Sequence, residues 1–512
     1  MSMSHASLHR VTCEPVPICV AAQHVSCATP SRALRGMLPL LVAGLCACAM
    51  PVSRDGAWVE SWTTTSDHRL ALSHAEAPMR DAGRLAKDPA RTEIVIDAGV
   101  RHQRMVGFGA SITDASAWLI QHRMDARQRD ALLRELFGRE GDGVGFDFAR
   151  LTIGASDFSR SHYSLDDPPD GRPDPELRHF GIAPNMGDVV PVAREVLAIN
   201  PDLKIMASPW SAPAWMKDSG ALVTGRLRPE HYDAFARYLL RYVDAMAAEG
   251  IPVFALTVQN EPDYEPKDYP GMRFNAPERA RFIGHHLGPL RERTRPALQI
   301  FDWDHNWDKP EEPMAVLADP AASRHVSAVA WHCYGGDVSA QTPVRDAHPD
   351  KDVYMTECSG GDWEPVRSGG LTLQARTLVI GTTRNWARGV LFWNLALDQD
   401  NGPHAGGCDT CRGVVTVDSR TGEVTRTDDY YALAHASRFV RRDAWRIGST
   451  QTAGGIDNVA FENVDDGSRV LVASNSNDTP RTIAVRDGDR GFEHAMPAKS
   501  VVTFRWAGAM GR

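Results

Sequence analysis

The sequence predicts an α/β fold, a (β/α)₈ TIM barrel with an attached β-sandwich domain formed by N-terminal strands and the C-terminal segment. Short apolar runs alternate with amphipathic runs through the middle of the chain, and alternating strand-like runs flank this region on both sides. Two of the central apolar runs end in a glutamate, where a barrel strand would meet its loop. A doubly wound sheet uses the same alternation, but no Gly-rich phosphate loop follows a strand, so the barrel is favoured.

The chain length and charge are consistent with this architecture. A chain of 512 residues exceeds the usual single-domain size, which fits one large barrel plus a smaller module. The formal net charge of -9 is spread along the chain without a long basic run, so there is no electrostatic reason to expect a nucleic acid partner. We expect a signal or targeting segment (1–50), N-terminal sandwich strands (57–103), the barrel (104–430) and the C-terminal β-sandwich (431–512).

The N-terminal region has the pattern of an export signal. Arg32 and Arg35 precede the apolar run Met37–Met50, which is too short to span a bilayer and has the size of a secretory h-region. Leu45–Cys48 loosely resembles a bacterial lipobox, in which Cys48 would carry the lipid. We therefore expect an exported protein, either periplasmic, secreted or an outer-membrane lipoprotein, and leave membrane association through a lipid anchor open.

Strand-like runs at both ends of the chain predict the sandwich. Each run alternates apolar and polar residues or is rich in β-branched residues, and Asp, Gly and Asn turns separate the C-terminal ones. The N-terminal strands need a partner sheet, which the C-terminal strands supply. The predicted strands are Trp58–Thr65, Thr92–Asp97, Val459–Asn463, Arg469–Ser474, Thr482–Val485 and Ser500–Phe504.

Eight further runs predict the barrel strands, and amphipathic segments separate several of them. The strand candidates are Met105–Gly109, Phe148–Gly154, Leu203–Ser208, Val253–Gln259, Leu298–Asp302, Ala328–Tyr334, Asp352–Glu357 and Gly389–Leu395. The helical candidates include Pro229–Glu249, Ala276–Thr294 and Leu371–Trp386.

Four of the nine cysteines follow residue 50. Cys408 and Cys411 have the spacing of half a zinc site, but no second pair exists at matching spacing, and a local disulfide is the simpler interpretation in an oxidising compartment. Cys333 and Cys358 lie at the ends of neighbouring predicted strands, and we expect buried thiols there.

The two glutamates suggest a chemistry. Glu261 follows the fourth predicted barrel strand and Glu357 ends the seventh, so both lie on the face of a barrel that carries active sites. Cleavage of a glycosidic bond requires two carboxyl groups, an acid for the leaving oxygen and a nucleophile or base for the anomeric carbon. The hypothesis is therefore a glycoside hydrolase.

Five motifs, in order and at similar spacing, resemble glycoside hydrolase family 30, the glucosylceramidase family. The resemblance covers the chain from about residue 57 to its end. It implies a barrel with a β-sandwich and a retaining mechanism, with the acid at the end of strand 4 and the nucleophile at the end of strand 7. The motifs are Gly107–Asp114, Ala207–Pro213, Gln259–Pro262, Thr356–Cys358 and Phe392–Leu397.

Roles follow from the chemistry and the resemblance together. We expect Glu261 to act as the general acid, held protonated near neutral pH by the second carboxylate and by partial burial. Glu357 is the expected nucleophile. Asn260 is expected to bond the sugar 2-hydroxyl, and Tyr334 to donate to the nucleophile and keep it ionised.

Sugar recognition is expected from four further residues. Asp114, Trp210 and Trp393 match family positions that hold the non-reducing glucose, although Asp114 also has the position of an N-cap for a helix starting near Ala115. His404 replaces the Asn of a Gly-Pro-Asn motif seen in glucosylceramidases. His305 and His332 also fall on the predicted active-site face, but neither has a metal-ligand spacing, so we expect binding or supporting roles for them and no metal site.

The resemblance leaves the substrate open, because the family includes glucosylceramidases, endo-β-1,6-glucanases and xylanases. Our first expectation is a β-glucoside or glycolipid, and an endo-β-1,6-glucanase acting on a polysaccharide is the alternative. A carbohydrate-binding protein without catalysis is a third hypothesis, disfavoured because both glutamates are present. We expect no cofactor, since two carboxyl groups suffice for the reaction, and a monomer, since barrel and sandwich need no partner to complete a core.

Overall fold

The computed structural model describes residues 57–85, 91–363, 370–452 and 454–508. The predicted targeting segment, including Cys48, lies outside these ranges. Within them, no helix has the length and apolar character needed to cross a membrane. Export, the lipid anchor and the monomeric state stay predictions.

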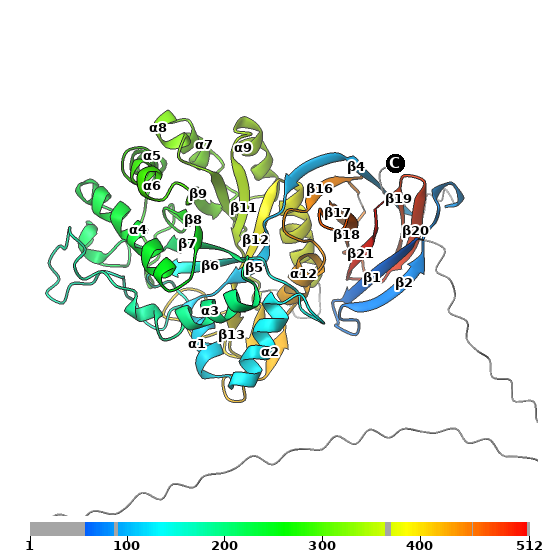
Figure 1. The fold of residues 1–512 in the computed structure, drawn as a ribbon, viewed down its shortest axis with the longest axis horizontal. Coiled ribbons are helices and arrows are strands. Elements are labelled where there is room, and N and C mark those ends of the chain that lie inside the picture. Colours follow the sequence, from blue (N-terminus) through cyan, green and yellow to red (C-terminus); the bar gives the residue numbers. More distant parts are fainter. Residues whose placement is uncertain (1–56, 86–90, 364–369, 453, 509–512) are drawn as a thin grey trace, which may run out of the picture. The chain divides into compact units, whose positions relative to one another are not determined.

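Eight parallel strands close into a barrel in the described part of the chain, and each corresponds to a predicted strand (Figure 1). Neighbours in the sequence are neighbours in the barrel, and β12 closes it by pairing with β5. Several of these strands are buried along their whole length, as expected where helices cover a parallel sheet. The strands are β5 (Gly107–Ser111), β6 (Phe148–Ile153), β7 (Lys204–Pro209), β8 (Val253–Thr257), β9 (Gln299–Asn306), β10 (Ala328–His332), β11 (Asp352–Glu357) and β12 (Ala387–Asn394).

Helices surround the barrel strands, and the three helical segments singled out in the sequence are all present. Local signals fix their ends: α2, for example, starts with a capping box in which Asp125 and Gln128 bond each other's backbone N–H groups. The main helices are α1 (Asp114–His122), α2 (Ala126–Phe137), α3 (Val189–Ile199), α4 (Tyr232–Ala248), α5 (Ala276–Phe282), η5 (Ile283–Leu287), α6 (Gly288–Thr294), α7 (Glu311–Leu317), α8 (Pro320–Ser323), α9 (Gln341–Ala347), α10 (Gly370–Gln374), η7 (Ala375–Gly381), α11 (Thr382–Arg384) and α12 (Asp428–Ser437).

Several short elements complete the described chain outside the sandwich strands. They are the 3₁₀ turns η1 (Ala82–Arg84), η2 (Ala183–Asn185), η3 (Ala214–Met216), η4 (Pro229–His231) and η6 (Val338–Ala340), and the small sheet of β13 (Ala396–Leu397), β14 (Val415–Val417) and β15 (Val424–Arg426).

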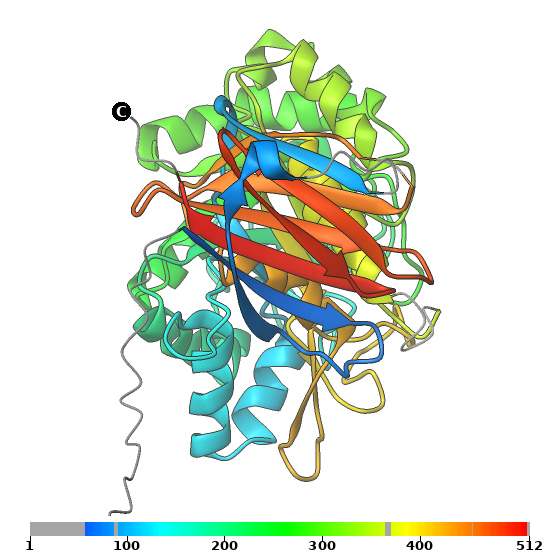
Figure 2. The ribbon, with the colours of Figure 1, turned by 90° about the vertical axis from the view of Figure 1, so that its right-hand side faces the viewer.

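N-terminal and C-terminal strands together build the β-sandwich, as predicted. Figure 2 shows the blue N-terminal strands lying beside the red C-terminal ones, and β1 pairs with β21 along its length. Strand β4 pairs with β16 through one part and with β19 through another, so it joins the two layers. The strands are β1 (Trp58–Thr65), β2 (Ser73–Pro78), β3 (Arg80–Asp81), β4 (Thr92–Arg104), β16 (Trp445–Ser449), β17 (Ile456–Glu462), β18 (Ser468–Asn475), β19 (Arg481–Asp487), β20 (Arg490–Met496) and β21 (Ser500–Ala507).

Helix α12 connects the two architectures through a buried histidine. One ring nitrogen of His435 lies 2.9 Å from the Thr64 hydroxyl of β1, and the other lies 2.9 Å from the Thr503 hydroxyl of β21. Burial lowers the pKa of His435 to about 3, so the ring is neutral in the folded protein at neutral pH.

Acid is therefore expected to destabilise the protein through His435. Between pH 6.5 and about 3 the unfolded chain binds a proton at this ring that the folded chain does not, so stability falls as pH falls. The contribution is about 1.4 kcal/mol for each pH unit below the unfolded pKa. In urea unfolding at pH 7, 6 and 5, His435→Gln should start less stable than wild type but lose less stability on acidification. Parallel pH dependences for the two proteins would contradict this.

Candidate active site

Glu261 and Glu357 meet at one face of the barrel. Glu261 follows β8, the fourth barrel strand, and Glu357 is the last residue of β11, the seventh, as the sequence predicted. A carboxylate oxygen of each and a ring nitrogen of His332 all lie within 4.8 Å of one another. Glu261 has a φ of 48°, in the left-handed region, and its backbone N–H donates to the Asp304 carbonyl at 3.0 Å. The backbone thus turns both carboxyl groups toward one point.

A buried arginine connects the site across the barrel. Arg150 lies inside β6 with no exposed surface, and its guanidinium donates to the Glu357 carboxylate. The same group donates to the Asn260 amide oxygen at 2.7 Å and to Asp304 at 2.9 Å. One rigid planar side chain therefore fixes three groups of the site relative to one another.

Asp304 is the counterpart of this arginine on β9. Besides Arg150, it accepts hydrogen bonds from the side chain of His332, at 3.1 Å, and from three hydroxyl groups. Although burial opposes ionisation, Arg150 and His332 hold the pKa of Asp304 well below its usual range. The hydroxyl donors come from β7, β8 and β11 and are Ser208 at 2.9 Å, Thr257 at 2.7 Å and Thr356 at 2.6 Å.

His332, the last residue of β10, faces both carboxyl groups. Its Nδ1 lies 3.0 Å from Glu261 and 3.9 Å from Glu357, and its Nε2 faces Asp304. Burial lowers the pKa of His332, but the charges of Glu357 and Asp304 outweigh burial and raise it to about 9. At this pKa the ring holds protons on both nitrogens at neutral pH.

Among the described residues, one further group has the side-chain spacing of a metal site. It consists of Glu60, His74 and Glu76 on β1 and β2, which lie away from the barrel strands and are partly or fully exposed.

The ionisation of Glu261 differs from the sequence-based expectation. Burial raises its pKa, but the charges of His305 and His332 and the hydrogen bond from His332 bring it below the usual value. From the sequence, the proton was expected on Glu261 because of the second carboxylate and burial. That expectation did not take account of these two histidine rings. For Glu357, burial and the charge of Glu261 raise the pKa, against His332 and Arg150. The proton near Glu261 therefore belongs to the Glu261–His332 pair.

The structure brings most of the other predicted residues to this site. The Tyr334 hydroxyl donates to Glu357 at 3.1 Å, which is the predicted contact, and Asn260 is held by Arg150. Trp210 and Trp393 stack with ring centroids 4.9 Å apart, and the Arg150 guanidinium lies 4.8 Å from the Trp210 ring. His404 packs beside Phe158, with the two ring centroids 5.8 Å apart, and its Nδ1 is 3.0 Å from the Gly406 carbonyl.

Asp114 is the first residue of α1, whose N-cap is Thr113, so the N-cap alternative for Asp114 was wrong. Its contact with a sugar stays a prediction. Asp114 accepts a hydrogen bond from Tyr163 at 2.8 Å, and burial raises its pKa. Asp157, which was not predicted, also lies near the pair: burial, followed by the charge of Glu357, raises its pKa to about 8. Its buried Oδ1 has no hydrogen-bond partner among the described residues.

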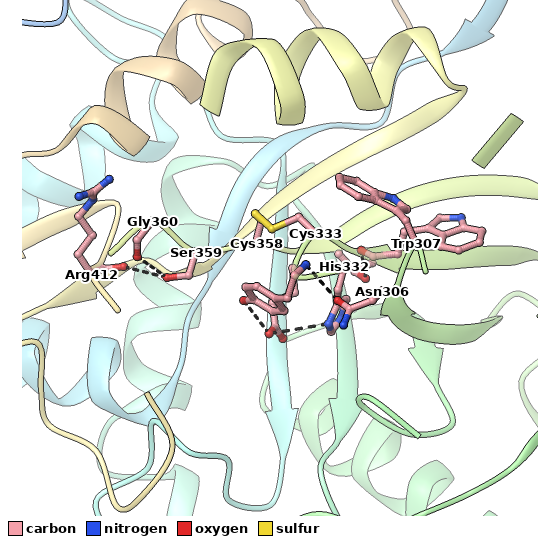
Figure 3. The surroundings of a disulfide bond; sticks show 12 residues. Asn306, Trp307, His332, Cys333, Cys358, Ser359, Gly360 and Arg412 are labelled. Carbon is pink, nitrogen blue, oxygen red and sulfur yellow. Dashed lines mark hydrogen bonds and ion pairs between the residues drawn. A yellow bond between two sulfur atoms is a disulfide. The ribbon is translucent and has the colours of Figure 1, made fainter. Parts of the chain in front are cut away.

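Both cysteine pairs of the described chain form disulfides. The predicted local bridge between Cys408 and Cys411 is present. The expectation of buried thiols at Cys333 and Cys358 was wrong, because these residues are bonded to each other (Figure 3). They follow the paired residues His332 and Glu357 on adjacent parallel strands, which places their Cα atoms 5.4 Å apart, within bonding range.

Sequence reasoning missed Arg150, Asp304 and Asp157. Arg150 had a detectable signal, since a charged residue inside an apolar run that forms a fully buried strand needs a buried partner. Asp304 lies in the polar run Asp302–His305, beyond the predicted strand, and gave no such signal. Asp157 lies in the loop after β6, where the pattern of the run gave no comparable signal.

Replacing the buried arginine is expected to destabilise the fold. Arg150→Met leaves Asp304 and Glu357 buried without their cation, and we expect it to lower the free energy of unfolding by about 3 to 5 kcal/mol. Urea unfolding near pH 7 measures this. Arg420→Met is the matched control, because its ion pair with Asp418 is exposed and should matter little. Equal, small effects of both substitutions would refute the central role of Arg150.

Comparisons with known proteins agree with this geometry. Residues 105–440 match the glycosyl hydrolase family 30 TIM-barrel domain, and residues 443–504 match the beta sandwich domain of the same family. The chain is 33% identical over 468 residues to an endo-1,6-beta-D-glucanase of Neurospora crassa, covering 88% of this chain and 94% of that protein. It is 28% identical over 411 residues to putative glucosylceramidase 4 of Caenorhabditis elegans, covering 76% and 78% respectively. A solved endo-beta1,6-glucanase superposes with a TM-score of 0.81 at 33% identity, covering 88% of this chain and 100% of that one. The chain therefore belongs to glycosyl hydrolase family 30.

Proposed function

We propose that this glycoside hydrolase is a retaining endo-β-1,6-glucanase that uses Glu357 as nucleophile and Glu261 as acid and base. The spacing of the two glutamates supports the retaining mechanism. Their nearest carboxylate oxygens lie within 4.8 Å, which suits direct attack by one carboxylate, whereas inverting enzymes keep the two groups about 6.5 to 9.5 Å apart to admit a water.

Glu357 has the surroundings of a nucleophile. Arg150 donates to one carboxylate oxygen and Tyr334 to the other, and both contacts favour the ionised form. In the first step, a Glu357 oxygen bonds to the anomeric carbon while the bond from that carbon to the leaving oxygen breaks. In the second step, water attacks the same carbon and releases Glu357.

The acid is the Glu261–His332 pair, which holds one proton between them. His332 Nδ1 faces a Glu261 oxygen at 3.0 Å, so the proton passes to Glu261 as the leaving oxygen accepts it. The pair then consists of a carboxylate and a neutral imidazole, whose remaining proton faces Asp304. In the second step, Glu261 takes a proton from the attacking water and the pair is restored.

Polar and aromatic groups next to the glutamates are suited to one sugar ring. The Asn260 amide oxygen is occupied by Arg150, which leaves the amide nitrogen for the sugar 2-hydroxyl. Trp210 and Trp393 supply an aromatic wall. Asp114 and Asp157 each have a buried carboxyl oxygen without a partner among the described residues, and each is a candidate to bond a sugar hydroxyl.

The relatives support one of the candidate substrates over the other. The sequence motifs alone favoured a glucosylceramidase-like β-glucosidase. The similarity to the endo-1,6-beta-D-glucanase of Neurospora crassa, at 33% identity over 88% of this chain, reverses that order. Glucosylceramide or another β-glucoside stays the second candidate, because the chain is also 28% identical to a putative glucosylceramidase of Caenorhabditis elegans.

A substrate panel tests this proposal. We expect the protein to release oligosaccharides from β-1,6-glucan, with little action on an aryl β-glucoside, glucosylceramide or glucuronoxylan. Early products followed by NMR should be β-anomers, and Glu357→Gln should lose nearly all turnover on the glucan. Glucose released from glucosylceramide in preference to the glucan would favour the second candidate. Sugar binding with equal inactivity of wild type and Glu357→Gln would indicate a binding protein.

The proton shared by Glu261 and His332 determines the expected alkaline limb of the pH profile. His332 is protonated below about pH 9, so kcat/KM should be maintained below that value and fall as pH rises through it. In His332→Asn only the Glu261 carboxyl can hold the acid's proton, and we expect the alkaline limb to move down by about one pH unit or more. His305→Asn is the control, since burial lowers the pKa of His305 and leaves the ring neutral at alkaline pH. An unchanged alkaline limb in His332→Asn would rule out a shared proton.

A further inference from the structure

The disulfide between Cys333 and Cys358 joins the ends of the two strands that carry His332 and Glu357. His332 is the last residue of β10 and Glu357 the last of β11, and each is followed at once by one of the cysteines. Figure 3 shows the bridge between the ends of these two strands, next to His332. The covalent bond therefore joins the residue after the nucleophile to the residue between His332 and Tyr334.

Backbone pairing between β10 and β11 is irregular where the disulfide forms. Trp331 pairs with Met355, but His332 pairs with Glu357, so Thr356 has no partner and the register shifts by one residue. An extra residue of this kind interrupts the hydrogen-bond ladder and bends the strand. The ladder thus ends at the functional pair, and the disulfide is the next connection between the two strands.

Tyr334 depends on this connection more than its neighbours do. It lies beyond the end of β10 in a segment that is neither helix nor strand, the residue is 45% exposed, and two glycines follow it. Within the described residues, its hydrogen bonds are one from its backbone N–H to Asn306, at 3.0 Å, and one from its hydroxyl to Glu357, at 3.1 Å. The bonded Cys333 is its immediate neighbour in the chain.

We propose that the Cys333–Cys358 disulfide holds the Tyr334 hydroxyl against Glu357. Through this contact it orients the carboxylate of the nucleophile and favours its ionised form. This inference rests on the proposed function, because it assigns the nucleophile's role to Glu357. Tyr334 is the residue in contact with Glu357, and the two cysteines act through it.

The other groups that face Glu357 do not need the disulfide. They are Arg150 from β6, His332 from β10, Glu261 after β8 and Asp157 after β6. Arg150 and His332 are both fixed by Asp304, whose hydroxyl partners lie on three other strands. Loss of the disulfide should therefore release Tyr334 first. Since a donor to the charged carboxylate lowers its pKa, that loss should raise the pKa of Glu357.

The test is a double-mutant cycle between the disulfide and Tyr334. We compare wild type, Cys333→Ser/Cys358→Ser, Tyr334→Phe and the triple variant on β-1,6-glucan, with full pH profiles. Removing the disulfide should lower kcat roughly 10- to 100-fold with KM within about threefold, and should shift the acidic limb of kcat/KM to higher pH. In the Tyr334→Phe background the same removal should lower kcat less than about threefold, because the hydroxyl is already absent.

Reduction of the native bridge provides a second measurement if the serine variant does not fold. The starting protein is Cys408→Ser/Cys411→Ser, in which Cys333–Cys358 is the remaining bridge of the described chain. Dithiothreitol should lower its kcat by the same factor, reoxidation should restore it, and Tyr334→Phe in this background should be insensitive to both.

The outcomes separate the inference from the proposed function. An active wild type whose kcat is unchanged without the disulfide overturns the inference alone, and so does an equal loss of kcat in the presence and absence of the Tyr334 hydroxyl. A wild type that hydrolyses no member of the substrate panel overturns the proposed function, and the inference with it.

Discussion

The buried ion pair between Arg150 and Asp304 is the interaction on which the site depends. Burying two charges is costly, and the cost is offset here because nearly every donor and acceptor of the pair is used. Arg150 donates hydrogen bonds to Glu357 and Asn260, while Asp304 accepts them from His332 and from hydroxyl groups on three strands. These groups come from β6 to β11 and the segment after β8, so the pair connects six of the eight barrel strands at the site. It thereby contributes to preorganisation as well as to stability.

The same pair explains how two neighbouring carboxyl groups take different roles. Glu357 receives donors from Arg150 and Tyr334, whereas Glu261 faces His332, which Asp304 holds in place and keeps charged. In the proposed mechanism the first carboxylate attacks, and the second has a proton within hydrogen-bond distance. The covalent link at Cys333 and Cys358 extends this control to the side of Glu357 that the ion pair does not reach.

Much of the fold was predictable, because periodicity and strand order are local signals. All eight barrel strands and the shared origin of the sandwich were anticipated, whereas the sandwich strands β2, β3, β16 and β20 were not. Glu261, Glu357, Asn260 and Tyr334 were found because motifs and strand ends mark them. Asp157 was missed, since only the structure shows that this loop residue lies near the pair. The charge on His332 and the Cys333–Cys358 bond depend on contacts between separate strands, so spacing in the sequence did not indicate them.

Trapping the covalent intermediate tests the central claim most directly. A 2-deoxy-2-fluoro-β-glucosyl fluoride slows both chemical steps but carries a good leaving group, so a retaining enzyme should accumulate a glycosyl-enzyme. After proteolysis, mass spectrometry should place one fluoroglucosyl group on Glu357, and Arg150→Met should accumulate it far more slowly. A label on Glu261, or release of the α-anomer of the fluorosugar without any covalent adduct, would contradict the account.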